Sequence, residues 1–259
     1  MWLRGTLAVN HHWRMRKATG RLALTAAAVV ALAGCSVEAA SGVPAVATED
    51  LQSDIAARLD AAGERPESVT CKDPLVGEVG QTARCDVTMS PTNSFEPIVT
   101  VTGVDGETID YELVPALSVT QLERAVARLV ADGDGPAPSQ VSCDAGLLGQ
   151  LGEMTHCDVT ADGVTLRRTA EVTSVEGLMM NFDLVPMLTR AEVETSLLDE
   201  LARHLNRRPE AATCTGDLEG RPGNTVDCAV TDGPERAAFI LTVTAVDGDN
   251  IDYSYAPRG

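Results

Sequence analysis

Six cysteines recur in three evenly spaced pairs, and this spacing constrains the fold more than any other feature of the 259-residue chain. The two members of each pair lie fourteen positions apart, and the first members recur after 72 and then 71 residues. A proline lies five positions before each first cysteine, and a glycine lies five positions before each second one. The pattern Pro-x4-Cys-x8-Gly-x4-Cys, which we call the cysteine frame, therefore occurs three times without a gap. A repeat at a fixed period indicates repeated structural units.

The repeat also predicts how the cysteines pair. Six cysteines allow fifteen pairings, but three copies of one unit should each close locally. We therefore expect the disulfides Cys71–Cys85, Cys143–Cys157 and Cys214–Cys228. Closing a loop of this length contributes roughly 3 kcal/mol in the chain-entropy model. Zinc-binding or redox cysteines are not indicated, because no Cys-x2-Cys spacing occurs.

The N-terminus predicts export and a lipid anchor. Every charge before residue 35 is positive, and the apolar run from Leu22 to Gly34 is shorter than the about 20 residues that span a membrane. This pattern is typical of a signal peptide at 1–34, whether the chain starts at Met1 or at Met15. The run ends in Leu-Ala-Gly-Cys35, which resembles the bacterial lipobox and implies cleavage before Cys35 and a lipid on its thiol. Residues 35–47 then form a tether from the outer face of the cytoplasmic membrane.

Charge and composition exclude several classes of partner and site. The net charge of −18 becomes −23 once the five basic residues before Cys35 are removed. Such an acidic chain is not suited to nucleic acid, which needs a basic face. Aromatic residues make up only 3% of the chain, which argues against deep small-molecule pockets. We expect no cofactor and no metal.

Each repeat is predicted to contain a helix followed by strands. The three repeats are expected at 48–115, 118–186 and 189–256. Apolar residues at helical spacing follow Thr48, Ser118 and Thr189, and the last two match capping boxes with Gln121 and Glu192. A hairpin signal then surrounds a glycine in each copy, and an aromatic residue expected to anchor the core lies five positions later. The predicted fold class is α+β: three tandem small domains, each with one helix on an antiparallel sheet of about four strands and one local disulfide. The hairpin glycines are Gly106, Gly177 and Gly248, and the aromatic residues are Tyr111, Phe182 and Tyr253.

These motifs together resemble a known family. The lipobox, the opening helix, Val69-Thr-Cys71, the Gly-x4-Cys spacing and the Val104-Asp-Gly106 hairpin are similar to the paired-cysteine domain of unknown function found in actinobacterial exported proteins and lipoproteins. The resemblance covers about residues 45–255 as three copies. The middle copy departs from it at Glu176, where its neighbours have Asp. The family has no assigned catalytic residues, so the resemblance implies none here.

No catalytic motif was found in the sequence. His156 and His204 lie in different repeats, and the acidic run from Asp247 to Asp252 lacks the spacing of a calcium loop. We therefore expect a non-enzymatic envelope lipoprotein that binds an envelope protein or cell-wall partner or acts as a spacer. The alternative expectation is an inhibitor-type binding protein of an envelope or secreted hydrolase.

Overall fold

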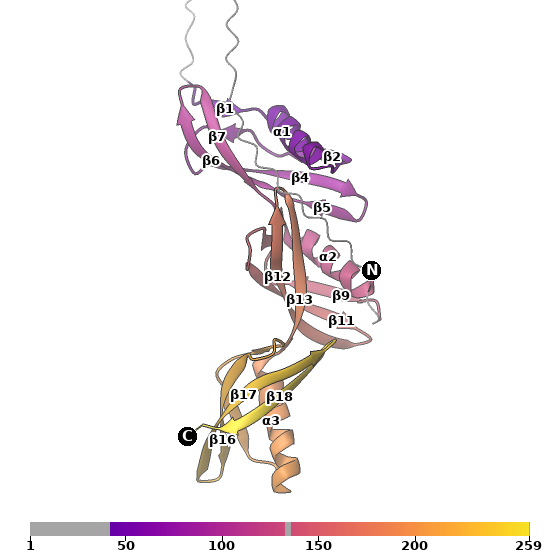
Figure 1. The fold of residues 1–259 in the computed structure, drawn as a ribbon, viewed down its shortest axis with the longest axis vertical. Helices are drawn as coiled ribbons and strands as arrows, with labels where there is room; N and C mark the ends of the chain where they lie inside the picture. The colour runs from indigo at the N-terminus through magenta and orange to yellow at the C-terminus, as the bar shows by residue number, and fades with distance from the viewer. Residues whose placement is uncertain (1–41, 133–135, 259) are drawn as a thin grey trace, which may run out of the picture. The chain divides into compact units, whose positions relative to one another are not determined.

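The structure is a computed structural model that describes residues 42–132 and 136–258. The predicted signal peptide, Cys35 and Gly133, where the second helix was expected to stop, lie outside the described residues. One element order, a helix followed by antiparallel strands, recurs three times along the chain (Figure 1). The structure therefore has the α+β class that the sequence predicts.

The first repeat contains a helix and a sheet with the strand order β2-β4-β6-β7, in which β5 also pairs with β4. Its elements, with the short strand before it, are β1 (Ala45–Val46), α1 (Thr48–Ala61), β2 (Ser68–Cys71), β3 (Leu75–Val76), β4 (Thr82–Ser90), β5 (Asn93–Phe95), β6 (Ile98–Asp105) and β7 (Thr108–Val114).

The second and third repeats follow the same plan. The second sheet has the order β9-β11-β12-β13, to which β15 of the third repeat adds a strand, and the third sheet has the order β14-β16-β17-β18. The second set of elements is β8 (Ala116–Leu117), α2 (Val119–Ala131), β9 (Gln140–Cys143), β10 (Leu147–Leu148), β11 (Met154–Ala161), β12 (Val164–Glu176) and β13 (Met179–Leu188). The third is α3 (Arg190–Leu205), β14 (Ala211–Cys214), β15 (Leu218–Glu219), β16 (Thr225–Asp232), β17 (Glu235–Asp247) and β18 (Asn250–Pro257).

The helix starts follow their local sequence. Ser118 and Thr189 cap α2 and α3, and both predicted capping boxes are present. The first helix lacks a box partner; its cap is Ala47, with no side-chain hydrogen bond, and Thr48 is already helical. That start lies one residue earlier than the sequence pattern suggests.

The three predicted local disulfides are present. In each repeat the two cysteines lie directly opposite each other on neighbouring antiparallel strands, with Cα atoms 3.9–4.0 Å apart. The glycine five positions before the second cysteine has a positive φ in every repeat, between 81° and 93°. A residue without a Cβ fits that turn best, which explains why the glycine recurs with the cysteines.

The segment before the first repeat differs from the prediction, and the segments between repeats share its structure; we call all three connectors. Residues 35–47 were expected to form a tether, yet Ala45–Val46 pairs with β3 as strand β1. The connector before α2 likewise pairs, as β8, with β10, and the end of β13 pairs with β15. Each connector is therefore a strand in the frame of the repeat that follows it.

The buried apolar residues form two clusters. One contains the cores of the first and second repeats together, and it includes Leu51, Val99, Leu122 and Leu178. The other belongs to the third repeat and includes Leu197 and Leu241. The aromatic residues predicted to anchor the core are half-buried and pack against these clusters.

Candidate functional site at the joint between the first two repeats

The predicted site residues fall into two groups. Cys35 lies outside the described residues, so its lipidation stays a prediction. The six paired cysteines are all buried, with at most 8% exposed, and their disulfides are part of the cores. These cysteines hold the scaffold on which any binding site is built.

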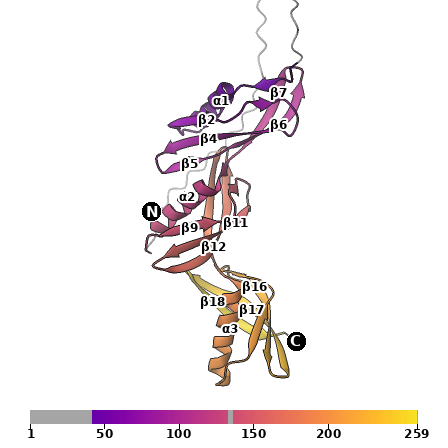
Figure 2. The same ribbon diagram turned by 180° about the vertical axis from the view of Figure 1, so that it is seen from behind.

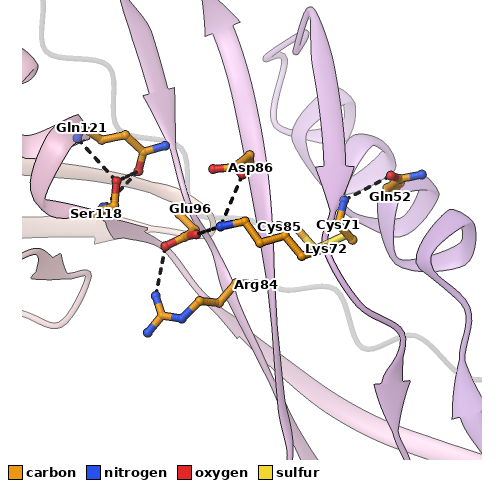
Figure 3. Close-up of polar contacts among 9 residues, drawn as sticks. All are labelled: Gln52, Cys71, Lys72, Arg84, Cys85, Asp86, Glu96, Ser118 and Gln121. Carbon is orange, nitrogen blue, oxygen red and sulfur yellow. Dashed lines mark hydrogen bonds and ion pairs between the residues drawn. A yellow bond between two sulfur atoms is a disulfide. The ribbon is translucent and has the colours of Figure 1, made fainter.

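A hydrogen bond that recurs in all three repeats joins each helix to the first cysteine of its disulfide. The backbone N–H of the first cysteine donates to a side-chain oxygen of the helix: Cys71 to Gln52 at 3.1 Å, Cys143 to Glu123 at 3.2 Å, and Cys214 to Glu194 at 2.9 Å. The contact in the first repeat is seen in Figure 3. These acceptors recur at the repeat period and hold each helix against the first strand of its frame.

Another recurrent hydrogen bond joins each connector to the cysteine frame that follows it. The backbone N–H of Gly77, Gly149 or Gly220 donates to the carbonyl oxygen of the proline that opens the preceding connector, at 2.7–2.8 Å. A Cβ on Gly149 would lie 2.6 Å from the Pro115 carbonyl oxygen, and the other two glycines are similarly crowded. Only glycine allows the two backbones to approach this closely.

A charged cluster lies beside the connector from the first to the second repeat (Figure 3). The Glu96 carboxylate, with 8% of its side chain exposed, accepts from Lys72 at 2.8 Å and from Arg84 at 3.1 Å. The Glu96 backbone N–H donates to the carbonyl oxygen of Ala116 in β8. The ion cluster therefore positions the strand that leads into the second repeat.

The electrostatics of Glu96 follow from these contacts. Burial opposes ionisation of Glu96, but the hydrogen bonds and charges of Lys72 and Arg84 outweigh it and hold the pKa of Glu96 below its ordinary value. The hydrogen bond to Glu96 and the charge of Asp86 raise the pKa of Lys72. Both shifts favour the charged forms of Glu96 and Lys72.

The aromatic residue after each hairpin faces the helix of its own repeat, but the contact differs in the second repeat. Tyr111 donates to Asp54 at 2.9 Å, and the Tyr253 hydroxyl lies 2.7 Å from the hydroxyl of Ser196. Burial and the Asp54 contact raise the pKa of Tyr111 to about 12. At the equivalent positions the second repeat has Phe182 and Ala125, which cannot form this hydrogen bond.

A cavity of about 290 Å³ lies at that position, lined by residues of β5, of α2 and of the segment from Leu178 to Phe182. Figure 1 shows where α2, β5 and the β12–β13 hairpin lie in the fold, and Figure 2 shows α2 and β5 from behind. We call it the joint cavity, because strands of the first repeat and the helix of the second both line it. The low aromatic content argued against a pocket, and the cavity is instead lined by a mixture of apolar and polar side chains, the polar ones including Asn93, Gln121 and Asn181. Its apolar lining includes Phe95, Leu117, Leu129, Met179, Met180 and Phe182, and its basic lining consists of Arg124 and Arg128.

The two arginines of the joint cavity stand out in this acidic chain. Among the residues that the structure describes, every Lys and Arg has a carboxylate within 4.0 Å except Arg124, Arg128 and Arg236. Arg124 and Arg128 bond only to backbone carbonyl oxygens, those of Thr120 and Thr92. Within the described part of the chain, two cationic groups without a carboxylate partner therefore line the joint cavity.

The contacts between the second and third repeats are polar instead. Arg168 pairs with Asp249 at 2.7 Å, Thr169 donates to Glu219 at 2.9 Å, and Arg221 pairs with Glu171. Asp249 follows the hairpin glycine of the third repeat, the position that the buried Leu178 occupies in the second. The acidic hairpin at Asp247–Asp252, which lacks the spacing of a calcium loop, therefore makes an ion pair with the second repeat.

Within residues 42–132 and 136–258, no group of three or more His, Cys, Asp or Glu side chains is placed to hold a metal ion. No helix in that part of the chain has the length and apolarity needed to cross a membrane. His156 and His204 lie apart, and each has a carboxylate neighbour, Asp144 or Glu200.

The sequence did not predict the joint cavity or the crowded glycines, which are Gly77, Gly149 and Gly220. The glycines had a usable signal, because each lies six positions after the first cysteine of its frame. The cavity had a weaker signal: helix positions that are Asp54 and Ser196 in the outer repeats are occupied by Ala125 in the middle one. Only a comparison of the three helices at the repeat period would have revealed it.

One comparison with known proteins identifies the family. The family model described as "Domain of unknown function (DUF4333)" matches residues 30–106 and 113–177, which together exceed half of the chain. The chain therefore belongs to this family. Neither matched segment extends into the third repeat. Searches of curated proteins and of solved structures found no match.

Proposed function

We propose that the chain is a non-enzymatic lipoprotein of the bacterial cell envelope, anchored by a lipid on Cys35 at the outer face of the cytoplasmic membrane. Its three repeats form α+β domains that bind an envelope protein or cell-wall partner and set the distance between that partner and the membrane. The family match over the first two frames and the lipobox at Cys35 support this proposal.

One observation carries the proposal: the same disulfide-closed frame occurs three times, and each copy is completed by the connector that precedes it. Disulfides of this kind persist in oxidising compartments outside the cytoplasm. Backbone pairing of connector and frame favours a semi-rigid succession of units over flexibly linked domains. Both properties suit a module that presents a binding surface at a distance from the membrane.

Membrane fractionation tests the anchor. Cys35→Ala should release the chain from the membrane fraction, whereas Ser36→Ala, one position later, should leave it membrane-bound. Membrane association that is unchanged in Cys35→Ala contradicts the lipid anchor.

Crosslinking in intact envelopes followed by purification tests the binding role. A recurrent envelope or cell-wall component should be recovered with the parent chain. A hydrolase activity of the purified chain that disappears when a single carboxylate is replaced would overturn the non-enzymatic assignment.

A further inference from the structure

Four residues that line the joint cavity differ from the residues at the equivalent positions of the outer repeats, 71 positions before and after. Arg124 and Arg128 replace Ser53 and Ala57 of the first repeat, and Thr195 and Asp199 of the third. Ala125 and Phe182 replace the hydrogen-bonded pairs that join helix to sheet in the outer repeats. The middle repeat has thus lost a polar contact and gained two cations at the same place.

The chemistry of the cavity is that of a site for an amphipathic anion. Part of its lining is apolar, since Phe95 is buried and Met179, Met180 and Phe182 are half-buried. Arg124 and Arg128 lie one turn apart on α2, and a guanidinium group binds carboxylate or phosphate with paired hydrogen bonds. A cavity of about 290 Å³ is at the small end of ligand pockets, which suits one acyl chain of moderate length.

We propose that the joint cavity binds a single-chain amphipath with an anionic head, carboxylate or phosphate, whose head contacts Arg124 and Arg128 and whose chain lies against Met179, Met180 and Phe182. This inference deepens the proposed binding role by naming a ligand class. It does not depend on the anchor, because the cavity is formed entirely by residues 92–182.

Calorimetric titration of the full chain carrying Cys35→Ala tests the inference without competition from an attached lipid. Dodecanoate and dodecyl phosphate, both below their micelle concentrations, should bind with one site per chain. Acetate, inorganic phosphate and dodecanol, which each lack one half of the amphipath, should bind at least about tenfold more weakly. The first two probes distinguish a carboxylate head from a phosphate head.

Variants locate the binding site. Arg124→Gln together with Arg128→Gln should weaken binding by about tenfold or more, because both charge-assisted contacts are lost. Arg236→Gln removes the third arginine without an ion pair, in the third repeat, and should leave binding unchanged. Equal weakening by Arg236→Gln would show that nonspecific charge attraction carries the binding.

A double substitution is expected to fill the joint cavity while preserving the fold. Ala125→Asp with Phe182→Tyr rebuilds the Asp54–Tyr111 contact of the first repeat and places a carboxylate beside the two arginines. Binding should fall below detection, while the melting temperature stays at or above that of the parent. Absence of binding by both dodecyl probes to the parent, or undiminished binding to this double variant, would overturn the inference.

Discussion

At the scale of single residues, the three repeats share their backbone geometry more closely than they share their charged side chains. The turn glycine before each second cysteine and the crowded glycine after each first cysteine recur in all three frames. The charged residues beside the disulfides do not: the first repeat uses Glu96 with Lys72 and Arg84, whereas the second uses Arg167 between Asp144 and Asp158. Positions where two backbones meet therefore define the fold, and neighbouring side chains are free to vary.

Gly149→Ala tests the close approach of connector and frame. The new Cβ would meet the Pro115 carbonyl oxygen at 2.6 Å, so the connector must shift, at a cost of about 1–3 kcal/mol in the free energy of unfolding. Gly216→Ala is the matched control, since no atom lies within 4 Å of its Cβ position. Chemical denaturation of both variants should show a loss for Gly149→Ala alone, and equal losses would contradict the role assigned to Gly149.

The lowered pKa of Glu96 predicts a contribution to the free energy of unfolding that is lost in acid. Because its pKa is lowered in the folded state, the stabilisation is complete above the ordinary glutamate pKa of about 4.3 and is lost as the pH falls through the lower, folded value. Glu96→Gln should cost about 1–3 kcal/mol at neutral pH, and its deficit relative to the parent should shrink as the pH falls below the ordinary glutamate pKa of about 4.3. Thermal unfolding across this range checks the prediction, with the exposed Glu107→Gln as control. A deficit that is constant with pH would contradict it.

At the scale of elements, each helix is attached to its sheet at two points: the side-chain acceptor for the first cysteine and the contact with the aromatic residue after the hairpin. The first point is present in every repeat, as Gln52, Glu123 and Glu194. The second is a hydrogen bond in the outer repeats only. The helix of the middle repeat therefore depends more on its bond to Cys143.

Glu123→Ala should destabilise the chain by about 1–2 kcal/mol, because the partly buried Cys143 N–H loses its partner. Glu123→Gln keeps an acceptor oxygen of the kind that Gln52 supplies in the first repeat, and it should remain within about 0.5 kcal/mol of the parent. Equilibrium denaturation distinguishes the two variants. If Glu123→Gln loses as much as Glu123→Ala, the carboxylate charge rather than the hydrogen bond is responsible.

The sequence predicted those elements whose signals are local. Cysteine spacing predicted the disulfides, and the Ser118 and Thr189 capping boxes predicted two helix starts. The connector strands β1 and β8 have two residues each and pair with partners about thirty positions away, so no periodicity could reveal them. The joint cavity was missed because it depends on what side chains such as Ala125 and Phe182 lack, and on how two repeats meet.

At the scale of the whole molecule, the two joints between repeats differ in chemistry. The first includes a shared apolar core, in which Leu178 of the second repeat is buried, beside the Glu96 ion cluster. The second joint is made by ion pairs and hydrogen bonds, and the third repeat has a separate core. We expect the third repeat to unfold independently of the first two.

Leu197→Ala tests this independence. The side chain is fully buried in the third core, and its truncation should cost about 2–5 kcal/mol there. Hydrogen exchange followed by mass spectrometry should show faster exchange in α3 and β16–β18, with protection of the first two repeats unchanged. Faster exchange throughout the described repeats would show that the three units unfold as one.

We propose that the chain is an exported lipoprotein stiffened by three local disulfides, and the intact mass of the native chain tests this proposal. The native chain, extracted from the envelope and alkylated without reduction, should begin at Cys35, carry the added mass of a lipid on that residue, and take up no alkylating reagent. After reduction it should take up reagent at six cysteines. An unmodified Cys35, a different first residue, or two or more free thiols before reduction would contradict the account.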